Sequence, residues 1–133
     1  MEAPYTRDIL RLAAAIPGQV SFDQLADARE LRSRACGSRV RVAVALDEAG
    51  RVAEVRQAVE ACAYGQAAAA LMGARAVGLD RSGAVEMVRT VEGWLAGGEG
   101  AQWLAPLAPA LGRTGRHEAI LLPFRALAAA FER

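Results

Sequence analysis

The sequence predicts an α+β fold, in which a three-stranded antiparallel sheet packs against several helices. Two neighbouring segments, 38–46 and 51–59, alternate apolar with polar residues as half-buried strands do. The turn 47–50 between them ends in Gly50, which can adopt the positive φ of a tight hairpin. Apolar residues with helical spacing precede and follow this hairpin. Helices kept apart from a small antiparallel sheet are typical of the α+β class.

The N-terminal part of the chain begins with a predicted helix over residues 4–16, which Pro17-Gly18 ends. Ser21–Leu25 is a connector, either a short helical turn or an edge segment. Arg29–Arg34 is predicted as the first strand. In the hairpin that follows, a slip of one residue would turn the arginines of the second strand into the core, so the register is well determined. The apolar stripe of the first helix consists of Ile9, Leu10, Leu12, Ala13 and Ile16.

Helical patterns occupy the rest of the chain. The first begins at Cys62 and is rich in alanine, and Gly73 loosens its end. Either Asp80 or Ser82 can cap the next helix.

Two further helical segments follow. A short piece over 103–111 is interrupted by Pro106 and Pro109. The last helix is predicted over 116–131. Pro123 lies inside it and should bend it unless the helix begins later.

Length and composition favour one domain, residues 1–133, with one core. Hydrophobic residues make up 53% of the chain, which argues against disorder, and the net charge of +1 does not indicate nucleic acid or a membrane as a partner. No apolar run is long enough to span a bilayer, and the polar start lacks a signal-peptide pattern. Two cysteines are too few for a disulfide framework. We therefore expect a cytoplasmic protein whose thiols are free or bound to metal.

The two cysteines are the main candidates for chemistry. Cys36 lies in a predicted turn beside Gly37, and Cys62 lies at the start of a predicted helix. The free N–H groups and the dipole at a helix N-terminus favour a thiolate, which is the form that binds iron or zinc and attacks a persulfide. The alternative is that each cysteine is a small, buried apolar residue.

The other candidate residues have simple structural explanations. His117 is the only histidine, Glu118 suits the first turn of a helix, and Ser38 suits a turn. No phosphate loop, catalytic triad or pair of carboxylates is evident, and the chain has no lysine, which argues against a hydrolase. The arginines at 29, 32, 34, 39 and 41 indicate either a solvated sheet face or a surface for an acidic partner.

Four segments share an order and spacing with a known family. They are Pro4–Leu10, Ala35–Val40, Ala61–Met72 and Arg116–Leu127. In turn they resemble an opening helix, a Cys-Gly-Asp turn, a Gly-Cys-x-x-Ser segment with a small-residue helix, and an Arg-x-x-Cys-x-x-Leu helix. Together they resemble the U-type iron–sulfur cluster assembly scaffolds, namely IscU, SufU and the N-terminal domain of NifU. The resemblance covers nearly the whole chain.

The resemblance implies a SufE/NifU-like fold and a scaffold that is not an enzyme. It also implies a site of three cysteines and an aspartate that accepts sulfur from a cysteine desulfurase, binds iron or zinc, and holds a transient [2Fe–2S] cluster for recipient proteins. Carried over by position, Cys36 and Cys62 match two ligands. Ser38 stands in place of the aspartate, Ala119 stands in place of the third cysteine, and Glu118 stands where some members have histidine.

These departures leave three functional hypotheses. The first is a divergent scaffold or carrier of iron or a [2Fe–2S] cluster. Its further ligand is either Glu118 or His117, or else two chains of a homodimer each contribute Cys36 and Cys62. The second is a non-catalytic module that binds zinc or regulates the assembly machinery. The third is a thiol enzyme with Cys62 as nucleophile and His117 as base.

Overall fold

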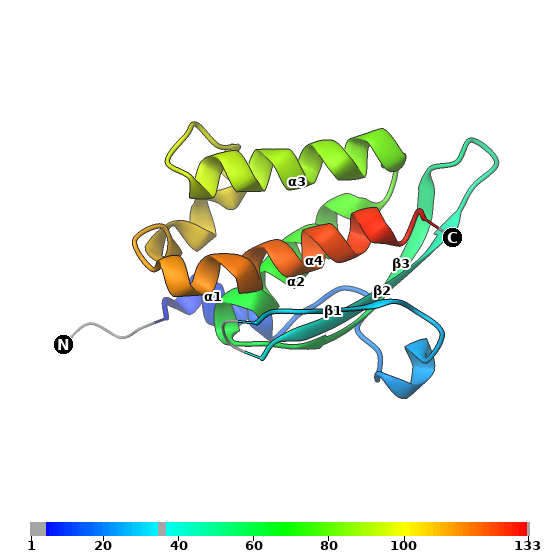
Figure 1. Cartoon of the computed structure of the whole chain (residues 1–133), viewed down its shortest axis with the longest axis horizontal. Coiled ribbons are helices and arrows are strands. Elements are labelled where there is room, and N and C mark those ends of the chain that lie inside the picture. Colours follow the sequence, from blue (N-terminus) through cyan, green and yellow to red (C-terminus); the bar gives the residue numbers. More distant parts are fainter. Residues whose placement is uncertain (1–4, 35–36, 133) are drawn as a thin grey trace.

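The computed structural model describes residues 5–34 and 37–132 and confirms the α+β fold. Its sheet has the order β1-β2-β3 and is antiparallel throughout (Figure 1). The strands are β1 (Glu30–Arg32), β2 (Arg39–Leu46) and β3 (Val52–Glu60). Over the described ranges the α-helices are α1 (Arg7–Ala13), α2 (Ala63–Ala76), α3 (Arg81–Leu95) and α4 (His117–Ala129). Three 3-10 helices complete this part of the chain: η1 (Asp23–Leu25), η2 (Gln102–Ala110) and η3 (Thr114–Arg116).

The helices form layers on one side of the sheet. Helices α2 and α4 pack against each other and against the strands, while α1 covers α2 and α3 covers α4 (Figure 1). The core therefore lies between the sheet and the α2–α4 pair. Its largest fully buried apolar side chains are Tyr64, Phe124, Ile9, Met72, Leu104, Leu107, Ile120 and Leu127.

A β-bulge changes the strand alternation at the hairpin end of the sheet. Ala45 pairs with Glu54 and Leu46 pairs with Val52, so Ala53 has no opposing residue. The extra residue turns the chain, and Val52 and Val55 are both buried although they are three positions apart. Beyond the bulge, exposed and buried residues alternate only from Glu54 to Gln57, because the next residue, Ala58, is buried as well.

Gly73 has a different role from the one predicted. It lies inside α2 and is buried, where a Cβ would come within 2.8 Å of Gln57 Nε2 and 3.1 Å of Pro17 Cβ. The fully buried Gln57 uses this space to donate from Nε2 to the carbonyl oxygens of Pro17 (3.0 Å) and Ala69 (3.1 Å). Glycine at position 73 thus permits a hydrogen-bonded junction between α2, β3 and the segment after α1.

Two predicted helices have different limits in the structure. Helix α1 ends at Ala13, three residues before the predicted end at Ile16. Pro17 keeps Ile16 itself out of helical backbone, because the residue before a proline avoids it. Leu10 of the predicted apolar stripe is 52% exposed. Helix α4 continues through Pro123, which has no N–H to donate to the carbonyl of Ala119.

Candidate functional site

Three chain segments meet at the end of the sheet opposite the β2–β3 hairpin. They are the β1–β2 connection, the start of α2 and the start of α4 (Figure 1). We call this meeting point the corner. Cys36 belongs to the β1–β2 connection but lies outside the described residues, so its role as a ligand stays a prediction.

Backbone hydrogen bonds close the described part of the β1–β2 connection. The N–H of Ser33 donates to the carbonyl of Ser38 (2.8 Å), and the N–H of Gly37 donates to the carbonyl of Ser33 (3.2 Å). Gly37 has a φ of +70°, which glycine adopts at little cost. Ser33 and Ser38 are both buried. These bonds hold Ser33 close to Gly37 and Ser38, and a role for Ser38 as a ligand stays a prediction.

Cys62 is the N-cap residue of α2. Its backbone is extended (φ −64°, ψ 169°), and its half-buried side chain makes no capping hydrogen bond. The thiol is not in a disulfide. The carbonyl of Cys62 accepts the N–H of Gln66 (2.9 Å), the first bond of the helix. The sulfur thus lies at the positive end of the helix dipole, as the sequence predicts.

Glu118 ties α4 to the β1–β2 connection. Its Oε1 accepts the backbone N–H of Arg34 at 2.6 Å, across 84 residues of sequence. Arg34 lies two positions before Cys36, so this bond holds the chain that leads to the cysteine. Sequence reasoning missed the contact because no local pattern indicates it.

Ala119 lies inside the corner. It is 1% exposed, and a Cβ built on Gly65 would be 3.5 Å from the Ala119 Cβ and 3.3 Å from its carbonyl oxygen. Gly65 is in the first turn of α2, three residues after Cys62. Position 119 therefore faces the start of α2, but alanine has no donor atom on its side chain.

His117 is held by the neighbouring 3-10 helix. Its Nε2 lies 2.9 Å from the carbonyl oxygen of Ala110, so Nε2 carries the proton and donates it in this contact. The ring is half-buried. Use of Nε2 as a metal ligand would break this bond, and a role for His117 as a ligand stays a prediction.

The donor set fits thiophilic metals but is small. Within residues 5–34 and 37–132, no group of three or more His, Cys, Asp or Glu side chains is placed to hold a metal ion. The chain has two thiols, which suit iron–sulfur clusters or zinc, whereas a [2Fe–2S] cluster normally has four protein ligands.

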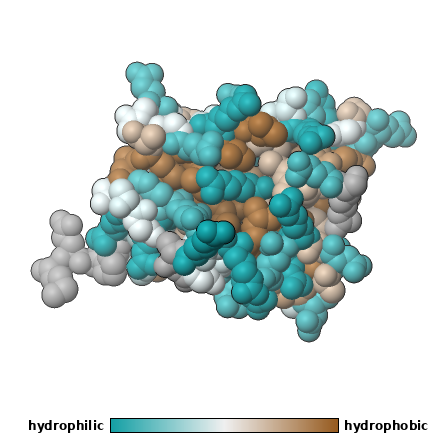
Figure 2. All heavy atoms as spheres, viewed as in Figure 1, coloured by the Kyte–Doolittle hydropathy of each residue, from teal (hydrophilic) through white to brown (hydrophobic). Residues whose placement is uncertain are grey.

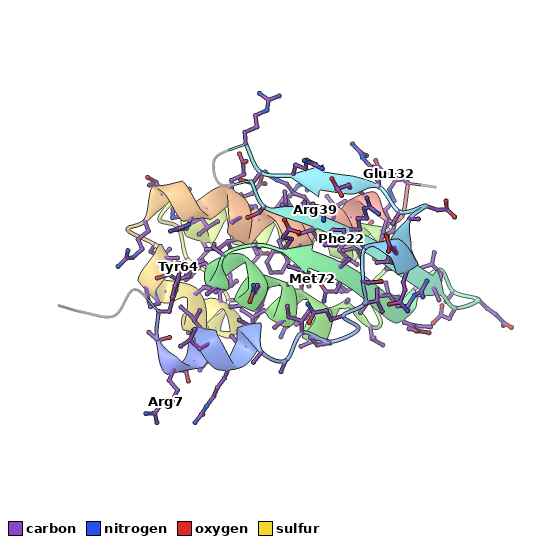
Figure 3. The ribbon with its side chains drawn as sticks, turned by 90° about the horizontal axis from the view of Figure 1, so that it is seen from below. Arg7, Phe22, Arg39, Tyr64, Met72 and Glu132 are labelled. Atoms are coloured by element: carbon purple, nitrogen blue, oxygen red, sulfur yellow. The ribbon has the colours of Figure 1, made fainter. Side chains whose placement is uncertain are left out.

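Three arginines of the predicted cluster, Arg32, Arg39 and Arg41, are held on the outer sheet face by the chain's own groups, whereas Arg29 pairs with Glu132. Glu30 accepts from Arg32, Arg39 and Arg41, and the Arg39 guanidinium stacks 3.8 Å from the centre of the Phe22 ring (Figure 3). The Arg32 guanidinium, helped by Arg41, lowers the pKa of the Glu30 carboxyl below its ordinary value. These residues form an internal network, with Glu30 and Phe22 as the partners that the sequence pattern did not indicate.

The fold matches solved structures over nearly the whole chain. An N-terminal nitrogen-fixing NifU-like protein from Brucella abortus has a TM-score of 0.83 at 23% identity, covering 96% of this chain and 91% of that one. A protein named as an iron–sulfur cluster assembly scaffold for the SUF system, from Fervidobacterium islandicum, has a TM-score of 0.77 at 20% identity, covering 96% of both chains. No protein-family profile and no curated protein matches the sequence.

These matches confirm the NifU-like fold that the sequence resemblance implies. Among the helices of the described residues, none has the length and apolar character to cross a bilayer.

Proposed function

We propose that this protein is a divergent scaffold or carrier that holds iron or a [2Fe–2S] cluster at the corner, with Cys36 and Cys62 as thiolate ligands. The observation that carries the proposal is the position of Cys62 at the N-terminus of α2, in the corner where Glu118 binds the N–H of Arg34. The likeness to a NifU-like protein and to a named SUF scaffold supports it.

The number of thiols favours a site shared by two chains. Two cysteines from each of two copies supply the four thiolates of a [2Fe–2S] cluster. The single-chain alternative uses Glu118 or His117, but Glu118 Oε1 and His117 Nε2 already hold backbone groups at 2.6 and 2.9 Å. Ligation through either atom would break its bond, whereas sharing between chains leaves both intact.

The absence of a thiol at position 119 changes how sulfur must arrive. Alanine cannot carry a persulfide, so sulfur from a cysteine desulfurase has to reach Cys36 or Cys62 directly, or the chain has to receive a finished cluster. Cys62, which is half-buried at the N-terminus of α2 and not in a disulfide, is a thiol that such a transfer can reach. A carrier that receives a finished cluster and passes it to recipient proteins needs no third acceptor.

The test is a metal and sulfide analysis of protein purified without oxygen. Iron, acid-labile sulfide and zinc per chain are measured before and after reconstitution with iron and sulfide, for the wild type, Cys36→Ser and Cys62→Ser. Ser82→Ala, on the exposed first turn of α3, is the matched control. We expect iron and sulfide in the wild type and the control and their loss in both cysteine variants. Iron that stays with both cysteine variants contradicts the proposal.

Size-exclusion chromatography of the same samples separates the two ligand arrangements. If two chains share a cluster, iron and sulfide elute with the dimer. A monomer that holds a complete cluster rules out sharing and leaves Glu118 or His117 as the further ligand.

A second candidate function is a non-catalytic module that holds zinc or regulates the assembly machinery. The alanine at position 119 favours it, because this buried position beside the start of α2 then carries no third thiol. Zinc without iron or sulfide under every condition, lost in the cysteine variants, would support this candidate over the first.

A further inference from the structure

A groove of about 380 Å³ lies between α3, the last turns of α4, and β1. It is separate from the corner, because Arg125 on its edge is seven residues beyond Glu118 on α4, about 10 Å along the helix axis. Its floor is apolar and consists of Leu31, Val85, Val88, Ala128 and Ala129. Figure 2, which views the molecule as in Figure 1, shows hydrophobic atoms between α3 and α4 with hydrophilic ones around them.

The rim of the groove carries an excess of positive charge. Four arginines line it, at positions 29, 81, 89 and 125, against two glutamates, Glu92 and Glu132. Glu132 is shared by Arg29 (3.6 Å) and Arg81 (3.5 Å), so one carboxylate faces two guanidiniums. The groove therefore offers more cationic groups than its own carboxylates neutralise.

The ion pairs of Arg29, Arg81 and Arg89 are weak enough to exchange partners, whereas Arg125 donates to Glu92 at 3.2 Å. The side chains of Arg29, Arg81 and Glu132 are 71%, 64% and 50% exposed, and the Arg89 pair with Glu86 is 3.8 Å long. Exposed pairs of this kind contribute little to stability. A guanidinium can bind an incoming carboxylate with two parallel hydrogen bonds, which is a better geometry than these long contacts.

We propose that this groove is a docking site for a short acidic segment of a partner protein, which places apolar side chains on the floor and carboxylates against the arginines. Apolar side chains suit the floor, because docking there removes apolar surface of both partners from water. Carboxylates suit the rim, because its arginines outnumber its glutamates. The proposal does not depend on the cluster chemistry, since the groove and the corner lie on different turns of α4. A partner can dock while the corner remains accessible.

The test measures binding of a fluorescein-labelled peptide of glutamate and leucine, with leucine at every third or fourth position, by fluorescence anisotropy. The groove variant is Arg81→Glu with Arg89→Glu. The matched control is Arg7→Glu with Arg11→Glu, which makes the same change of charge on α1; Figure 3 places Arg7 and Glu132 on opposite sides of the molecule. Val85→Asp is a second groove variant, which changes the floor at an exposed position.

We expect the wild type and the control to bind the peptide, with affinity falling as salt rises. The groove variants should bind about tenfold more weakly. Equal binding by groove and control variants would overturn the proposal, as would equal binding of a peptide with lysine in place of glutamate. Failure to bind the peptide, together with binding to vesicles of phosphatidylserine and phosphatidylcholine, would also overturn it and indicate a membrane surface instead.

Discussion

Replacing Glu118 with alanine should loosen the β1–β2 connection without unfolding the protein. The change removes the acceptor of the Arg34 N–H, a bond of 2.6 Å between α4 and the turn that leads to Cys36. A hydrogen bond to a carboxylate is worth about 1.5–3 kcal/mol where it is shielded from water. This bond is exposed, so about 1 kcal/mol is the expected loss. That energy corresponds to about fivefold in the equilibrium that opens the turn.

Hydrogen exchange followed residue by residue measures this opening directly. The amide of Arg34 should exchange about fivefold faster in Glu118→Ala, while amides within β2 and β3 keep their rates. Glu118→Gln retains an acceptor oxygen and should give a smaller change. Glu92→Ala is the matched control, since it removes an exposed carboxylate on α3 that pairs with Arg125 at 3.2 Å. Unchanged exchange at Arg34 in Glu118→Ala would refute the role of this bond.

Three further predictions concern capping, pH and the corner. Asp80→Ala should lower the free energy of unfolding by about 1 kcal/mol, because the Asp80 side chain caps α3 by accepting the N–H of Gly83 at 2.8 Å. Ser82→Ala should have little effect, and urea denaturation of the two variants compares them. The pKa of Glu30 is lowered by Arg32 and Arg41, so its stabilising effect is present above its ordinary pKa of 4.5 and is lost as pH falls through the lower folded value. Urea midpoints measured from pH 7 downward should therefore fall less steeply below about pH 4.5 in Glu30→Gln than in the wild type; equal slopes would contradict this. Ala119→Cys should let a monomer retain iron and sulfide. It should also lower the free energy of unfolding by about 1 kcal/mol, because the sulfur is added at a buried position. Ser82→Cys, which adds a thiol outside the corner, should retain none beyond the wild type.

The elements with strong local patterns were predicted well. The alternation over 38–46 and 51–59 corresponds to β2 and β3, and the connector at 21–25 contains the 3-10 helix η1. Local sequence left the choice between Asp80 and Ser82 open, and the structure selects Asp80 by its contact with Gly83. The β-bulge at Ala53 was not predicted, because a bulge depends on how two strands align and not on the pattern of either one.

The candidate site could be predicted only in part. The position of Cys62 at a helix start follows from the change of period along the chain, and the structure agrees. The contact of Ala119 with Gly65 and the bond from Arg34 to Glu118 could not be predicted from residue spacing, because both join segments that are distant in sequence. The same holds for Gln57, a polar residue that is fully buried because two carbonyl groups reach its side chain.

The sequence by itself determined the fold class, the register of β2 and β3 outside the bulge, and the presence of two thiols with no third at position 119. These features depend on the period of apolar residues, on turn residues and on residue identity, all of which can be read from short stretches of sequence. Only the tertiary structure decided that the starts of α2 and α4 meet the β1–β2 connection, and that α3, α4 and β1 enclose an apolar groove edged by arginines. The physical reason is that such sites arise where helices and strands pack against one another, and packing depends on the shapes of whole surfaces rather than on any local run of residues.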